Sequence, residues 1–160
     1  MNIFYLAADP YVAASMHCDK HVCKMIIETA QMLSSVQARY GSDNTPYKPT
    51  HVKHPSTLWA GDSASNYRWL VSLGKGLCNE YTRRYGKIHK TQEIIDKLSE
   101  SPDGLPDVGY TKIPQCMPEE YKTEDSITAY RNYYIADKAR FAKWKYTETP
   151  AWWPSVTEEA

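Results

Sequence analysis

Apolar residues recur at intervals of three and four positions in three long stretches of the chain. This spacing places them on one face of a helix, whereas no segment alternates apolar and polar residues at a period of two over any length. The segment from Thr91 to Leu98 has the same amphipathic spacing over a shorter range. The pattern therefore predicts an all-α fold: three long helices near residues 10–38, 55–85 and 125–145, plus short helices.

Polar residues and prolines suggest where these helices begin. Asp9-Pro10 fits the start of the first helix, and we expect Asp62 and Asp125 to be the N-caps of the second and third. A short turn is expected at residues 55–60, before the main part of the second helix. The apolar pattern weakens just before His17, where the first helix can break.

The chain has 160 residues, enough to bury a core without disulfide bonds, so we predict one compact α-helical domain over residues 1–160. Segments 41–54 and 99–122 are rich in proline and polar residues and are predicted to be long irregular connections. Residues 150–160 are predicted to form an aromatic C-terminal tail. The 19 basic and 19 acidic residues give no formal net charge, so nucleic-acid contact would need local basic patches.

The amino-acid composition indicates which kinds of protein and site to expect. Tyr (13) and Trp (5) outnumber Phe (2), and rings with a polar tip suit binding surfaces. The four cysteines form no CxxC pair, so a zinc ribbon is not expected, and we predict neither a metal nor a cofactor. No secretory leader is visible, and no apolar run approaches the ~20 residues that cross a bilayer. We expect a monomer with reduced thiols and no membrane partner, in the cytoplasm (of a host cell if the protein is viral).

A polar row follows the first predicted helix beside its apolar face. His17, His21, Lys24 and Glu28 are spaced by four, three and four, so they stack on one side, with Lys20 beside them. The row is either a solvated face or the wall of an active site. In an active site, imidazole, carboxylate and amine groups could perform acid–base or nucleophilic chemistry. His17 and His21 are also spaced to share a metal ion, but this interval is common without one.

Two further regions could bind nucleic acid. In the loop at 41–54, four side chains could grip phosphate oxygens, or they could be incidental charges on a solvated loop: Lys48, His51, Lys53 and His54. In the last helix and tail, basic residues alternate with aromatic ones, as in surfaces that stack bases, although the aromatics could instead be core. The candidates there are Arg131, Lys138, Lys143, Trp152 and Trp153.

Two segments resemble the pyrimidine-dimer DNA glycosylases of the bacteriophage endonuclease V type. Residues 54–86, HPSTLWAGDSASNYRWLVSLGKGLCNEYTRRYG, are similar to the central helical segment of that family. Residues 126–153, SITAYRNYYIADKARFAKWKYTETPAWW, resemble its terminal basic helix with the proline and aromatic cluster that follows. The order of elements agrees as well: an N-terminal arm, a long first helix, a central helix, a basic helix and an aromatic tail.

The resemblance implies an all-α DNA repair enzyme that flips a base out of the duplex. Such enzymes attack the sugar C1′ with the N-terminal α-amine, form an imine and cleave the backbone by β-elimination. An α-amine with a pKa near ~8 is partly neutral at physiological pH and can act as a nucleophile. The resemblance also implies an assisting carboxylate on the first helix and phosphate-binding basic residues there, positions that Lys20 and Lys24 match.

The chain departs from the family pattern at two places. His21 aligns with the catalytic acid of the family, and Glu28 lies a turn or two further along. Asn2 is bulkier than the residues that permit removal of the first methionine, so we assign the free amine to Met1.

We therefore predict a DNA-acting glycosylase and lyase whose catalytic candidates are Met1, His17, His21, Lys24 and Glu28. A second hypothesis is a non-catalytic nucleic-acid or nucleotide binder on the same scaffold, for which the alternation of basic and aromatic residues suffices. A third is an enzyme acting on free or modified nucleotides with the histidines as acid and base.

Overall fold

The structure is a computed structural model that describes residues 1–154, and every regular element in this range is a helix. The predicted all-α fold is thus confirmed, although only two of the helices are long. Residues 155–160 of the predicted tail lie outside the described residues. The helices are α1 (Pro10–Met16), α2 (Asp19–Arg39), α3 (Pro55–Asp62), α4 (Ala64–Tyr85), α5 (Gln92–Lys97), the 3₁₀ turn η1 (Glu119–Tyr121) and α6 (Ser126–Lys138).

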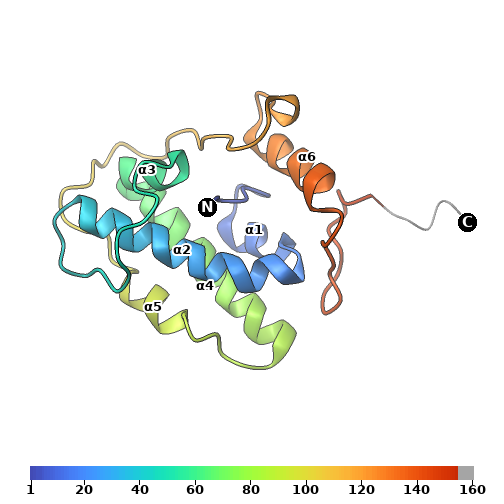
Figure 1. The fold of residues 1–160 in the computed structure, drawn as a ribbon, viewed down its shortest axis with the longest axis horizontal. Helices are drawn as coiled ribbons and strands as arrows, with labels where there is room; N and C mark the ends of the chain where they lie inside the picture. Colours follow the sequence, from blue (N-terminus) through green and yellow to red (C-terminus); the bar gives the residue numbers. More distant parts are fainter. Residues whose placement is uncertain (155–160) are drawn as a thin grey trace, which may run out of the picture.

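The two long helices, α2 and α4, cross at the centre of the molecule, with α1 packed on α4 (Figure 1). A glycine allows the contact between α1 and α4. A Cβ at Gly76 would lie 2.8 Å from the Cβ of Ala14, closer than two such atoms can approach. Among helices in the described residues, none is long and apolar enough to cross a membrane.

The first predicted helix breaks at His17, as its weakened pattern allowed. His17 and Cys18 are extended, with ψ of 139° and 161°, so α1 and α2 are separate helices. The buried guanidinium of Arg84 on α4 stabilises the break. It donates to the carbonyl oxygens of Ser15 and His17 and pairs with the carboxylate of Asp19 at 3.2 Å.

Two predicted helix boundaries are wrong. Asp62 is the last residue of α3, and the N-cap of α4 is Ser63, whose hydroxyl accepts from the backbone N–H of Asn66 at 3.0 Å. The expected turn at residues 55–60 belongs to the helix α3. The predicted N-cap Asp125 of α6 is confirmed, with its carboxylate accepting from the Ile127 N–H.

The last helix ends at Lys138 instead of Lys145 because the chain finds other partners there. The carbonyl of Lys143 accepts from the N–H of Asp19, and the N–H of Lys145 donates to the Asp19 carboxylate, both at 2.8 Å. Residues 139–154 therefore run beside the start of α2 and do not extend α6 (Figure 1).

The N-terminal arm, residues 1–8, has no secondary structure yet is part of the core. Ile3 and Leu6 are fully buried, and the carbonyl of Leu6 accepts from the Arg131 guanidinium on α6 at 2.9 Å. The Trp69 indole N–H on α4 donates to the carbonyl of Ala8. The arm is fixed by side chains from distant helices, which places the chain's amino group inside the fold (Figure 1).

Candidate active site

The α-amino group of Met1 lies 3.5 Å from the Glu28 carboxylate on α2. The other carboxylate oxygen is 3.7 Å from the Lys24 ammonium, so one carboxylate faces two amines. These groups line a cavity of about 350 Å³. Its wall is completed by the arm, the start of α3, α6 and the loop that carries Cys116 between α5 and η1, which we call the 116 loop. The predicted residues Met1, His21, Lys24, Glu28, His54 and Lys138 all reach this cavity, which we call the amine pocket.

Asn2 determines where the amine points. Its side-chain amide donates to the carbonyl of Cys116 at 3.0 Å, and its oxygen accepts from the N–H of Ile3 at 2.8 Å. Phe4, two residues on, is 5% exposed and anchors the arm against α2 and α6. Met1 is thus held by the buried residues that follow it, and its amine is positioned beside Glu28.

His54 lies at the N-cap of α3, and its ring is fixed by that position. The Nδ1 atom accepts from the backbone N–H of Ser56 at 3.1 Å, so the proton of the neutral ring sits on Nε2. Burial lowers the pKa of His54, and the positive Met1 amine and His51 act in the same direction. A neutral imidazole N–H is therefore available at the amine pocket.

His21 also lines the amine pocket, as a neutral and tightly held ring. Burial, together with the neighbouring His17 and the ammonium groups around it, lowers its pKa to about 2. Its ring stacks on Phe4 at a centroid distance of 4.6 Å and meets Phe141 edge-on at 5.4 Å. The Nδ1 atom contacts the hydroxyl of Tyr134 at 2.7 Å.

A second, adjoining cavity of about 370 Å³ shares His21, Lys24 and Lys138 with the amine pocket. Its other lining residues are Lys20, Arg140 and Phe141, so four side chains bring positive charge and none brings negative charge. The Lys20 ammonium and the Arg140 guanidinium lie 4.9 and 5.5 Å from the centre of the Phe141 ring. We call this cavity the cationic trench. Its charge suits the phosphates of a nucleic acid.

His17 does not share the face of His21, Lys24 and Glu28, because it precedes the first residue of α2. It is fully buried, and its Nδ1–H donates to the carbonyl of Ala13 at 2.7 Å. Burial lowers its pKa to about 4. The rings of His17 and His21 are 6.5 Å apart, and within residues 1–154 no three His, Cys, Asp or Glu side chains converge on a possible metal position.

The other predicted binding residues lie outside the amine pocket. Lys48, His51 and Lys53 are exposed in the 41–54 loop, and of its four candidates only His54 reaches that pocket. Lys143 is exposed beside α2.

The predicted binding residues Arg131, Trp152 and Trp153 take part in packing. The Arg131 guanidinium lies 5.4 Å from the Trp152 ring centre and holds the arm. Trp152 and Trp153 both make T-shaped contacts with the Tyr134 ring, and each is half-buried in this aromatic cluster.

Sequence reasoning missed several pocket residues. Tyr133 lines the amine pocket, with the Lys138 ammonium 4.8 Å from its ring centre, and Arg140 lines the trench. Both belong to the alternation of basic and aromatic residues that singled out this segment. Cys116 had no comparable signal, because only the fold brings the 116 loop to the arm.

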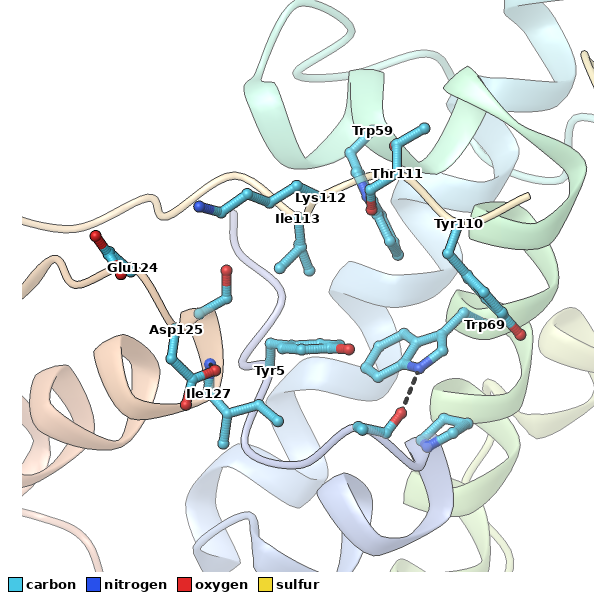
Figure 2. Close-up of a pocket in the computed structure, with 13 residues that line it drawn as sticks. Tyr5, Trp59, Trp69, Tyr110, Thr111, Lys112, Ile113, Glu124, Asp125 and Ile127 are labelled. Carbon is cyan, nitrogen blue, oxygen red and sulfur yellow. Dashed lines mark hydrogen bonds between the residues drawn. The ribbon is translucent and has the colours of Figure 1, made fainter. Parts of the chain in front are cut away.

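A larger cavity, about 610 Å³, lies beside Tyr5 of the arm (Figure 2). Aromatic rings surround it, and its indole N–H groups are already satisfied: Trp59 donates to the carbonyl of Thr111 and Trp69 to that of Ala8. Asp125 at its edge caps α6. The pair of amine and carboxylate lies in the smaller cavity, so we place the candidate site there.

Comparisons with known protein families, with curated proteins and with solved structures gave no match to this chain.

Proposed function

We propose that the protein is a DNA glycosylase and lyase that uses the Met1 amine as nucleophile. One observation carries the proposal: the amine lies 3.5 Å from the Glu28 carboxylate, in a pocket that opens beside a trench of four cations. After an amine bonds to carbon, its nitrogen must lose a proton, and a carboxylate within a few ångströms can take it. The cationic trench adds a place for the phosphates that flank the reacting sugar.

The reaction can be written with these groups. The neutral amine bonds to C1′ while the base leaves with the electrons of the glycosidic bond and takes up a proton from water. The nitrogen then loses a proton to Glu28, and the sugar ring opens at O4′, which takes up that proton, giving a C1′ iminium. Loss of a C2′ proton to water expels the 3′ phosphate with the electrons of the C3′–O bond, and hydrolysis of the C1′=N bond frees the Met1 amine.

The proposal explains both departures from the family pattern, at His21 and at Asn2. Glu28 supplies the carboxylate near the amine, so His21 is not needed for that role. Asn2 anchors the arm through the Cys116 carbonyl, a tether that a smaller residue could not provide. The resemblance and the geometry therefore support the same nucleophile.

Borohydride trapping on a duplex with an abasic site or a pyrimidine dimer tests the proposal. We expect a covalent adduct, mapped by peptide mass spectrometry to the amine of Met1 and not to Lys24. One glycine added before Met1 should abolish trapping because it moves the amine away from Glu28. No adduct and no strand cleavage by the unmodified protein, or an adduct on Lys24, would overturn the assignment.

A non-catalytic nucleic-acid or nucleotide binder is the second candidate, favoured by the trench of four cations, which needs no amine to bind phosphate. It predicts salt-dependent binding that survives Glu28→Gln and the added glycine, without any trapped adduct. The same trapping experiment, run beside a binding titration, separates the two functions.

A further inference from the structure

The hydroxyl of Tyr134 is buried among three polar neighbours. Tyr134 has no exposed surface, and its oxygen accepts from the backbone N–H of Cys18 at 3.0 Å. The same oxygen lies 2.7 Å from Nδ1 of His21 and 3.3 Å from the sulfur of Cys18. The mechanism proposed above uses none of these atoms.

The Tyr134 hydroxyl can donate one hydrogen bond, so only one of its neighbours can accept its proton. The Cys18 backbone N–H can only donate, so it occupies a lone pair of the Tyr134 oxygen. The proton is left for His21 Nδ1 or for the Cys18 sulfur, and an imidazole nitrogen is a stronger acceptor than a thiol sulfur. The shorter distance, 2.7 Å, also belongs to the imidazole.

From this geometry we infer that Tyr134 is a positioning residue that fixes His21 as a neutral hydrogen-bond donor, with its proton on Nε2. Nδ1 is occupied as an acceptor, so Nε2–H is the group that the ring presents to a ligand. His21 lines both the amine pocket and the cationic trench. Stacking on Phe4 and edge contact with Phe141 keep the plane of the ring fixed.

The ligand atom that suits this donor is a phosphate oxygen next to the reacting sugar. This assignment of the ligand rests on the proposed function. Three ammonium groups, Lys20, Lys24 and Lys138, line the trench with the ring. A charged imidazolium there would meet their repulsion, whereas a neutral N–H adds a directional bond without a further positive charge. In this tautomer Nε2 has no free lone pair, so His21 is not a general base, and that role stays with Glu28.

Nitrogen-15 NMR of the histidine rings in the full chain tests the tautomer directly. We expect His21 to show a protonated Nε2 and an accepting Nδ1 at pH 7. Tyr134→Phe should produce a mixture of tautomers because the donor is lost. Cys18→Ala is the matched control: it removes the thiol, keeps the hydroxyl, and should leave the tautomer unchanged. A proton on Nδ1 in the unmodified protein, or a shift caused by Cys18→Ala, would overturn the inference.

Binding of a duplex with an uncleavable tetrahydrofuran abasic site tests the ligand. The duplex should shift the His21 Nε2 resonance. His21→Leu should weaken binding about tenfold, the size of one hydrogen bond to a charged oxygen, and His21→Gln should recover part of the loss. Single-turnover cleavage by His21→Gln should keep the pH profile of the unmodified protein, whereas loss of one limb would show that His21 acts as acid or base and would refute the assignment.

The NMR and trapping experiments distinguish a failure of the proposed function from a failure of the inference about Tyr134. The tautomer is measured in the free protein, so it can be as expected even if no DNA is cleaved, which would reject only the proposed function. Trapping at Met1 with a proton on Nδ1 of His21 would reject only the role of Tyr134.

Discussion

In the amine pocket, the neighbours of each side chain decide its role in hydrogen bonding and proton transfer more than its residue type does. Glu28 faces two amines at 3.5 and 3.7 Å, and His21 and His54 are each held through Nδ1. In the row predicted on one helix, Glu28 is the proton acceptor, Lys24 pairs with it, and His21 is a neutral donor. His17 belongs to the core, and the second neutral donor, His54, comes from the 41–54 loop.

Under the proposed function, Glu28→Gln should remove the proton acceptor and leave the cationic trench intact. We expect the rate of single-turnover cleavage at an abasic site to fall by ~10²–10⁴, the usual contribution of a general base. Affinity for the uncleavable duplex should change little. Glu124→Gln, at the rim of the larger cavity, is the matched control and should cleave at the unmodified rate. Equal losses in the two variants would contradict the role of Glu28.

The buried histidines predict how stability depends on pH. The pKa values of His17 and His21 are lowered by burial to about 4 and about 2, so the unfolded chain binds more protons below pH 6.5. Each ring adds stability that is complete above pH 6.5. That stability is lost as the pH falls, with a slope approaching about 1.4 kcal/mol per pH unit. Urea unfolding at pH 7, 6 and 5 measures the free energy of unfolding at each pH. His17→Gln should make this free energy depend less steeply on pH. An unchanged slope would show that His17 is not buried as a neutral ring.

At the scale of elements, the junction between α1 and α2 determines where the row of residues faces. The break at His17 leaves three backbone and carboxylate oxygens near Arg84, whose side chain has no exposed surface and also pairs with Glu80 at 3.0 Å. The weakened apolar pattern predicted the break. It could not predict the guanidinium that stabilises it, because Arg84 lies 65 residues further along the chain from Asp19.

Arg84→Met should therefore destabilise the fold strongly. Removing Arg84 takes the donor from two carbonyl oxygens, those of Ser15 and His17, and takes a buried cation away from two carboxylates. The cost of breaking such a buried cluster is about 3–5 kcal/mol. Arg83→Met is the matched control: Arg83 is 52% exposed and pairs with the same glutamate, and it should cost less than about 1 kcal/mol. Urea unfolding at pH 7 measures both, and equal losses would mean that the junction does not depend on Arg84.

At the scale of the molecule, a chain of no formal net charge concentrates positive charge in one place. The trench takes Lys20 and Lys24 from α2, Lys138 from α6 and Arg140 from the segment that runs back along α2. The helical spacing predicted that α2 would carry basic residues on one side. The early end of α6, which turns Arg140 toward α2, depends on two hydrogen bonds: the Asp19 N–H donates to the carbonyl of Lys143, and the Lys145 N–H donates to the Asp19 carboxylate.

A salt titration compares this trench with the 41–54 loop. Replacing Lys20 and Arg140 together by Gln should reduce the slope of log affinity against log salt by about 2, because each phosphate contact contributes about 0.9. Lys48→Gln with Lys53→Gln, two exposed residues outside the amine pocket, should leave the slope nearly unchanged. Fluorescence anisotropy with a labelled duplex at four salt concentrations gives the slopes. The reverse order would place the DNA on the loop.

The sequence alone determined the helical fold, its break at His17 and six of the residues that line the amine pocket, because apolar spacing and caps act over a few positions. Tertiary structure decided what those residues can do. It buried the arm beside α2, which places the amine next to Glu28, and it held His21 against Tyr134, 113 residues away. Such contacts join groups that share no local pattern, and the free energy that holds them comes from burying the surrounding core.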